Sequence, residues 1–439
     1  MNALTPTMAS EANWLESQIS RSKPMPLSAL HRRLRAKLIS HLSELRECTL
    51  VLEDADGALT LGDGISSLDV ALCCRLRVTN PDFYLAIATQ GSVGAGEAYM
   101  DGHWQCDDLV ALIRILVRNR DLLDAMEKKG VARLGAWALK VWHSFRRNTL
   151  RGSRRNISAH YDLGNDLFAL FLDNSMMYSS AVFASAEESL EVAATRKLDR
   201  ICQKLHLREG EHIIEIGTGW GGFAIHAARH YGVRVTTTTL SKEQRDLALQ
   251  RIAAAGLSDR IEVLLQDYRD LQGRYDKLVS IEMIEAIGHQ YLDTYFAKVR
   301  SLLKHDGMGL IQAITIEDHR YAQAVRSVDF IKRFIFPGSF IPALAPMQQA
   351  IARSTDLRLF HLEDMGSSYA LTLNHWRQRF LAQVQRVREL GYPERFVRMW
   401  EFYLCYCEGG FEERSISVVQ MVLTAPRCRR PNILPVLQA

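Results

Sequence analysis

Four glycines follow an apolar run in the middle of the chain. The run His212–Ile216 leads directly into Gly217, Gly219, Gly221 and Gly222. Glycine allows a strand to turn sharply into a helix, and without a Cβ the helix amides can approach a ligand closely. The string therefore predicts a site for a nucleotide-type cofactor. Alone it does not say which, because dinucleotide-binding enzymes carry a similar string.

The end of the next predicted strand separates the two main cofactor classes. An enzyme that binds NAD should place an acidic residue about 20 residues after the loop, where it holds the ribose hydroxyls. Here that strand ends in the threonines of 236–239, followed by Leu240 and Ser241. The NAD interpretation is weakened, although it stays an alternative. After the third predicted strand, Asp267 and Tyr268 offer a carboxylate and a ring that could hold an adenine.

The elements around these residues alternate between strand and helix patterns. Such alternation is typical of an α/β fold with a parallel sheet. The predicted strands are His212–Ile216, Val233–Thr239, Ile261–Leu265, Lys277–Ile281 and Gly309–Ile314.

Glu285 follows the fourth of these strands. A carboxylate without a role is costly to bury, so this position favours a function for Glu285.

Length and composition predict two domains. The chain has 439 residues, of which 47% are hydrophobic, which is enough for a large core. Residues 1–125 have a mixed pattern, with a helical segment near Leu27–Leu45 and strand-like runs at Cys48–Leu52 and Arg75–Val78. The net charge of +4 is too small to indicate a nucleic-acid partner.

Residues 126–155 are predicted to form a basic amphipathic linker helix. Nine lysines and arginines and no acidic residue lie between Lys128 and Arg155, and apolar residues recur at spacings of three and four. This pattern suits an anionic membrane surface or, alternatively, packing between domains. No leader-like start and no apolar stretch of about 18 residues is found, so a cytoplasmic location, peripheral at the inner membrane face, is expected.

The eight cysteines show no metal-binding pattern. They stand at positions 48, 73, 74, 106, 202, 405, 407 and 428, with no CxxC motif and no histidine at zinc-finger spacing. Neither a metal site nor a disulfide framework is predicted.

Ordered motifs along most of the chain resemble the cyclopropane fatty acid synthases and their mycolic-acid relatives. The resemblance implies a Rossmann-like class I S-adenosylmethionine-dependent methyltransferase domain over 156–439, with lid helices and an acyl-chain tunnel. A smaller mixed α+β domain would precede it, and the protein would be a homodimer. The motifs lie at 78–83, 94–102, 161–166, 177–181, 239–244, 280–285, 334–338, 369–373 and 403–411.

The resemblance also implies which residues hold S-adenosylmethionine. In this family a threonine and a glutamine replace the missing acidic residue, and Thr239 and Gln244 match them. The implied cofactor-binding residues are Tyr178, Ser179, Glu215, Gly217, Gly219, Gly221, Thr239, Leu240, Ser241, Gln244, Asp267, Tyr268 and Arg269.

The implied reaction adds the methyl carbon of the cofactor to a cis double bond of a membrane phospholipid and closes a cyclopropane ring. An alkene is a poor nucleophile, so the reaction needs close positioning, and the resulting carbocation needs electron-rich neighbours. Tyr178, Tyr369 and Phe411 are aromatic candidates, each of which could equally be core packing. The implied catalytic residues are Glu285, Tyr369 and Cys407, and Cys407 could also be a buried structural thiol.

In the family a bound bicarbonate removes the proton that must leave for the ring to close. The residues at the matching positions are Ser180, Glu285, Gln312, Ile314 and Tyr369. Ser180 and Gln312 replace a cysteine and a histidine, and both can still donate hydrogen bonds, but glutamine cannot titrate. A lipid C-methyltransferase that yields a methyl-branched or methylene chain therefore stays open, as does a non-catalytic lipid-binding protein.

Overall fold

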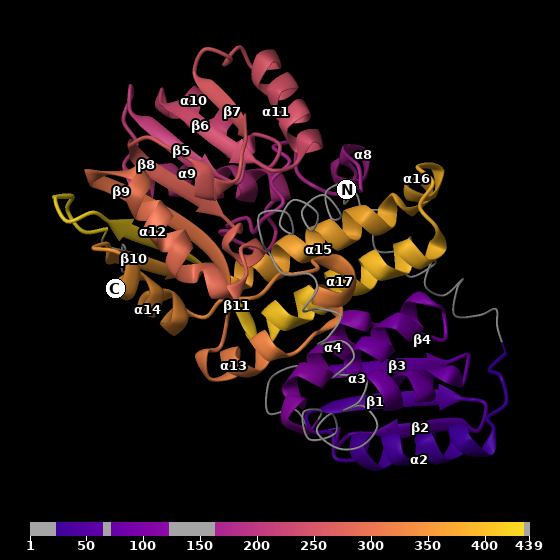
Figure 1. Cartoon of the computed structure of the whole chain (residues 1–439). Coiled ribbons are helices and arrows are strands. Elements are labelled where there is room, and N and C mark those ends of the chain that lie inside the picture. Colours follow the sequence, from indigo (N-terminus) through magenta and orange to yellow (C-terminus); the bar gives the residue numbers. More distant parts are fainter. Residues whose placement is uncertain (1–22, 65–71, 123–162, 434–439) are drawn as a thin grey trace, which may run out of the picture. The chain divides into compact units, whose positions relative to one another are not determined.

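The computed structural model describes residues 23–64, 72–122 and 163–433, and they belong to two compact units (Figure 1). Unit 1 takes Met1–Trp142, Ser327–Ile335 and Leu373–Ser415. Unit 2 takes His143–Arg326, Phe336–Thr372 and Ile416–Ala439. The division follows packing rather than chain order, because segments after residue 326 contribute to both units.

Unit 2 is built on a seven-stranded sheet of order β10-β11-β9-β8-β5-β6-β7. Neighbours from β9 to β7 are parallel, whereas β11 runs antiparallel to both β9 and β10. The five predicted parallel strands and the α/β fold class are confirmed. The strands are β5 (His212–Ile216), β6 (Arg234–Thr239), β7 (Ile261–Leu265), β8 (Tyr275–Ile281), β9 (Leu303–Ile316), β10 (Arg358–Asp364) and β11 (Ile416–Thr424).

Helices cover both faces of this sheet. Ile213 and Val279 point into one apolar cluster with α9 (Leu190–Leu205), α10 (Gly222–Tyr231) and α11 (Lys242–Ala254). Their neighbours Ile214 and Leu278 point into a second cluster, with α12 (Leu292–Leu302) and α14 (Leu344–Ser354). Each such side chain contributes about 1.5–3 kcal/mol when fully buried. Burial on both faces explains why these strands are almost continuously apolar.

The turn from β5 into α10 depends on glycine, as the sequence predicts. Gly217 has a φ of 103° and Gly221 a φ of 83°, values at which any other residue is strained. A Cβ on Gly222 would lie 2.6 Å from the carbonyl oxygen of Ser175. The loop therefore needs glycine for its backbone conformation and for close packing.

Unit 1 contains a four-stranded sheet of order β2-β1-β3-β4. Tyr99 of α3 donates a hydrogen bond to Glu401 of α17 (2.8 Å), and Arg114 of α4 donates to Glu413, the residue that follows α17 (2.7 Å). The elements are α2 (Ala29–Leu42), β1 (Cys48–Asp54), β2 (Gly57–Leu61), β3 (Leu72–Val78), α3 (Asp82–Met100), β4 (Trp104–Cys106), α4 (Leu109–Arg118), η4 (Ile331–Ile335), α16 (Val384–Glu389) and α17 (Glu394–Glu412).

Unit 1 also includes α16 and α17, of which α17 packs against α3 and α4. The predicted domain boundaries at residues 125 and 155 stay a prediction. The predicted linker helix at 126–155 lies outside the described residues.

The shorter elements complete the chain. They are α8 (Asn165–Ala169), η1 (Tyr268–Asp270), η2 (Ile284–Ala286), η3 (His289–Tyr291), α13 (Asp318–Arg326) and α15 (Gly366–Ala382), whose first residues belong to unit 2 and the rest to unit 1. Within the described ranges, no helix combines the length and apolar character needed to cross a bilayer. The same ranges contain no cluster of three or more histidines, cysteines or carboxylates that could hold a metal ion. All eight cysteines are free thiols.

Candidate active site

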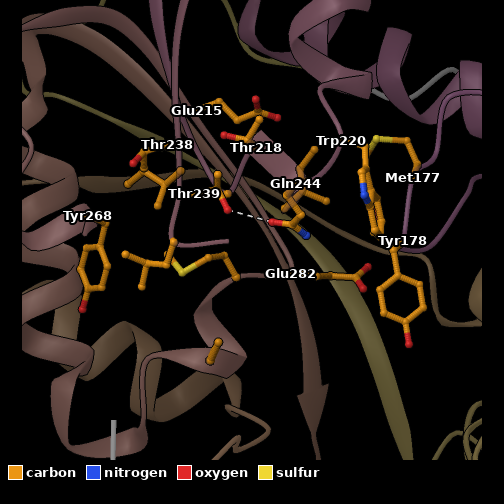
Figure 2. A pocket seen from close by; sticks show the side chains of 18 of the residues that line it. Met177, Tyr178, Glu215, Thr218, Trp220, Thr238, Thr239, Gln244, Tyr268 and Glu282 are labelled. Carbon is orange, nitrogen blue, oxygen red and sulfur yellow. Dashed lines mark hydrogen bonds between the residues drawn. The ribbon is translucent and has the colours of Figure 1, made fainter. Parts of the chain in front are cut away.

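A pocket opens in unit 2 where β5, β6 and β8 end (Figure 2). Its empty volume is about 1040 Å³, including solvent at its mouth, which is enough for a nucleotide-sized molecule. The site lies beside β5, where the connections turn to opposite sides of the sheet, and ligands of α/β proteins bind at such a point. The lining residues are Met176–Ser179, Glu215–Trp220, Thr238–Leu240, Gln244, Gln266–Tyr268, Ile281–Met283, Ala286 and Ile287.

Thr239 and Gln244, the predicted substitutes for an acidic residue, lie together in this pocket. The Thr239 hydroxyl donates to Oε1 of Gln244 at 2.8 Å, as Figure 2 shows. This leaves the Gln244 amide nitrogen as a donor on the pocket side. Leu240 also lines the pocket, whereas Ser241 does not. Ser241 is the N-cap residue of α11, and its hydroxyl accepts a hydrogen bond from the Gln244 backbone N–H.

Asp267 and Tyr268 line the pocket as predicted, and Arg269 does not. Arg269 instead donates twice to the Asp267 carboxylate, at 2.8 and 2.7 Å, and lies over the Tyr268 ring. It therefore orients both side chains. Gly221 likewise lies beside the pocket rather than in its lining, and it starts α10.

A buried lysine balances the negative charge beside the pocket. Lys197 on α9 has no exposed surface, and its ammonium group donates to the Ser179 hydroxyl at 2.8 Å. Burial lowers its pKa to about 8, opposed by the charges of Glu282, Asp173 and Glu215. Burial also raises the pKa of Glu215 to about 8. Lys197 is not among the residues predicted from the sequence, although its place on the apolar face of α9 is a signal that could have identified it.

Three of the residues predicted to hold an anion donate hydrogen bonds to the carboxylate of a glutamate for which the sequence predicts no role. The Ser180 backbone N–H (2.9 Å), the Gln312 amide (2.8 Å) and the Tyr369 hydroxyl (2.6 Å) all donate to the carboxylate of Glu282. Glu282 follows β8 directly and lines the pocket. Its place at the carboxyl end of an apolar strand is the signal that could have identified it.

Glu285 has a different environment. Its Oε1 accepts from the Ile314 backbone N–H at 2.6 Å, and its Oε2 has no hydrogen-bond partner among the described residues. Its pKa is raised to about 8, mainly by burial and to a smaller extent by the nearby charge of Glu282. Glu285 therefore holds a proton at neutral pH. It is not in the pocket lining, although its neighbour Ala286 is.

Cys407 and Phe411 lie on α17, which belongs to unit 1, and neither lines the pocket. The pKa of the Cys407 thiol is raised well above its ordinary value, mainly by burial and to a smaller extent by the charge of Asp329. The thiolate form is therefore disfavoured, which suits the structural alternative. A catalytic role for Cys407 stays a prediction.

The order of the seven strands, the glycine loop and the pocket define the class of S-adenosylmethionine-dependent methyltransferases. The family model described as mycolic acid cyclopropane synthetase matches residues 148–421, more than half of the chain. The chain belongs to this family, and the predicted resemblance is confirmed.

Known proteins of two kinds are similar to the chain. It is 39% identical over 348 residues to tuberculostearic acid methyltransferase UfaA1 of Mycobacterium tuberculosis, covering 77% of this chain and 80% of that protein. It is 38% identical over 354 residues to cyclopropane-fatty-acyl-phospholipid synthase of Escherichia coli, covering 80% and 87%. The crystal structure of mycolic acid cyclopropane synthase CmaA1 with SAH and CTAB matches with a TM-score of 0.58 and 29% identity, over 62% of this chain and 98% of that one.

The raised pKa of Glu285 predicts a pH-dependent effect of replacing it. Between the ordinary pKa of 4.5 and about 8, the folded protein keeps a proton that the unfolded chain releases. This residue's contribution to stability therefore falls as pH rises through that window. The variant Glu285→Gln lacks this proton, so its Tm minus that of the wild type should increase from pH 5 to pH 8 in thermal unfolding.

The exposed Glu317 provides the matched control. Its change to glutamine should shift Tm by the same amount at every pH. A difference between Glu285→Gln and wild type that does not vary with pH would contradict the assignment.

Proposed function

We propose that the protein transfers the methyl carbon of S-adenosylmethionine to the cis double bond of an unsaturated phospholipid acyl chain and forms a cyclopropane ring. The observation that carries the proposal is the composition of one end of the pocket. There the aromatic ring of Tyr178 and the carboxylate of Glu282 both line the pocket, and the Glu282 side chain points toward the ring (Figure 2). Both groups serve a reaction that passes through a carbocation and ends by losing a proton.

The cofactor is proposed to lie along the glycine loop. Gly217 and Gly219 leave room for it, and Gln244 with Thr239 holds the ribose hydroxyls by hydrogen bonds. Tyr268 offers a flat apolar surface for the adenine, fixed by Arg269. With the cofactor held by these residues, its sulfonium methyl would be positioned for attack by a weak nucleophile, and such positioning lowers the barrier.

The Tyr178 ring is proposed to stabilise the cation that methyl transfer leaves on the chain. Its edge packs against Phe168, with ring centroids 5.1 Å apart, and the Phe336 ring lies 6.4 Å away. These neighbours fix the position of the ring. An aromatic face attracts a cation by about 2 kcal/mol or more when both are desolvated.

Bicarbonate, the base implied by the resemblance, does not fit the residues expected to hold it. Ser180, Gln312 and Tyr369 donate to Glu282, and the Ile314 backbone N–H donates to Glu285. A further anion would meet the charge of Glu282 with each of these donors already engaged. No step of the proposed reaction is therefore assigned to bicarbonate.

A second product is supported by the relatives. Their names include a tuberculostearic acid methyltransferase as well as a cyclopropane synthase, at nearly equal identity. The alternative is a lipid C-methyltransferase that resolves the same cation without closing a ring, which leaves a methyl-branched or methylene chain.

Labelling separates these products. The protein is expressed in a host without the activity, grown on methionine with a fully deuterated methyl group, and its lipid acyl chains are examined by mass spectrometry. A cyclopropane ring keeps two of the three deuterium atoms, because the transferred methyl loses one in closing the ring. A methyl branch keeps all three when the cation loses its proton from a carbon of the chain, which leaves a double bond there. A methylene product also keeps two, but fragments differently after derivatisation. Absence of the labelled ring would defeat the primary proposal.

The role of Gln244 is testable by calorimetry with S-adenosylhomocysteine. The variant Gln244→Ala should weaken binding by about 1 kcal/mol, roughly fivefold, since it removes one hydrogen bond to the ribose. Gln250, exposed on the same helix, supplies the control, and its change to alanine should leave binding unchanged. Binding of NAD by the wild type would instead revive the oxidoreductase alternative.

Membrane contact is proposed through the basic segment Lys128–Arg155, on its composition alone. Each lysine or arginine near an anionic bilayer contributes about 1 kcal/mol, and salt screens this attraction. The protein should therefore float with vesicles of acidic phospholipid at low salt and less at high salt. Flotation that ignores anionic lipid would remove the electrostatic argument. The homodimer and the acyl-chain tunnel also remain proposals, drawn from the family resemblance.

A further inference from the structure

We propose that Glu282, a residue of this chain, accepts the proton released during ring closure and so replaces a dissolved anion as the base. The inference rests on the proposed function and deepens it. It starts from the finding that the donors expected to surround an anion surround this side chain instead.

Glu282 has the surroundings that a bound carboxylate base needs. Oε1 accepts from the Ser180 backbone N–H and the Gln312 amide, and Oε2 accepts from the Tyr369 hydroxyl. Glu282 lines the pocket and is partly exposed, and its partner Gln312 is fully buried. The Glu282 side chain points to the Tyr178 ring, where the proposed cation forms (Figure 2). A base at this point would be close to the carbon that must lose the proton.

A buried chain of amides fixes Gln312 as a donor toward Glu282. The Lys204 ammonium can only donate, and it contacts Oε1 of Gln420 at 2.5 Å. Gln420 therefore presents its nitrogen to Oε1 of Gln312, at 3.0 Å. The Gln312 nitrogen is left to face Glu282. Glu363 pairs with Lys204 and holds the far end of the chain.

The backbone of Glu282 has an unusual conformation that determines where its side chain points. Its φ is 49°, in the left-handed region that favours glycine, and its N–H donates to the carbonyl of Gln312 at 2.8 Å. This conformation is uncommon for a residue other than glycine, and at Glu282 it occurs in the pocket lining. Here the conformation turns the carboxylate into the pocket at the end of β8.

Atoms, charge and electrons are conserved in the proposed reaction. The methyl carbon leaves the sulfonium sulfur and bonds to one alkene carbon, which gives S-adenosylhomocysteine and a cation on the other alkene carbon. Glu282 then takes a proton from that methyl group, and the electron pair of the broken C–H bond closes the ring. Neutral Glu282 later returns its proton to solvent. No other reactant is required.

The first test is the variant Glu282→Gln, which keeps the shape of the side chain and removes its basicity. Ring formation should fall by on the order of 100-fold or more, the usual contribution of a positioned base. Affinity for S-adenosylhomocysteine and Tm should stay close to wild type. Unimpaired ring formation would overturn the role of Glu282.

The second test uses Glu282→Gly, which suits the backbone conformation and leaves the three donors without their acceptor. Added bicarbonate or formate should restore part of the activity of this variant. The wild type in buffer purged of carbon dioxide should keep its full rate. A wild-type rate that rises with added bicarbonate would overturn the proposal, as would a glycine variant that neither anion rescues.

Glu47→Gly is the matched control, because Glu47 in unit 1 is also a glutamate at positive φ, 58°. Its activity should equal that of the wild type with or without added anion. The two levels of the proposal fail separately. A wild type that yields no labelled ring defeats the proposed function, whereas a wild type that makes the ring independently of Glu282 defeats only the further inference.

Discussion

One carboxylate that accepts three hydrogen bonds organises the pocket of unit 2. Burial raises the pKa of Glu282 at the end of β8, and the hydrogen bonds from Tyr369, Gln312 and Ser180 and the charge of Lys197 oppose this shift. Burial, followed by the charge of Glu282, raises the pKa of Glu285 to about 8. The two carboxyl groups therefore differ in their surroundings, because Glu282 accepts three hydrogen bonds from other residues and Glu285 accepts one.

The sheet supplies the rigidity that this arrangement requires. Gln312 on β9 and Gln420 on β11 are paired in register, and both side chains are fully buried. An amide that could rotate could present its oxygen to Glu282, which the carboxylate would repel. The pairing with Gln420, itself fixed by Lys204, removes that freedom. Specificity for an anionic group is thus determined by a strand pair rather than by a loop.

Local signals were readable from the sequence, and distant pairings were not. The predicted bounds of β5 and β7 match the structure, because each strand is a short apolar run between turns. The hydrogen bond between Thr239 and Gln244 joins residues five apart, within reach of a motif. Tyr369 and Glu282 are 87 residues apart, and only the folded chain shows that they meet. The antiparallel place of β11 between β9 and β10 likewise depends on tertiary packing.

The position of β11 also has a consequence for how the protein matures. Along the chain, β11 is the last of the seven strands, yet it fills the space between β9 and β10. Until it inserts, β9 has an open edge and Gln312 lacks the partner that orients it, 108 residues away. Pairings this distant form late, because a long loop must close first. The orientation of Gln312 therefore depends on the last strand of the chain, whereas the glycine loop joins β5 and α10, which are adjacent in sequence.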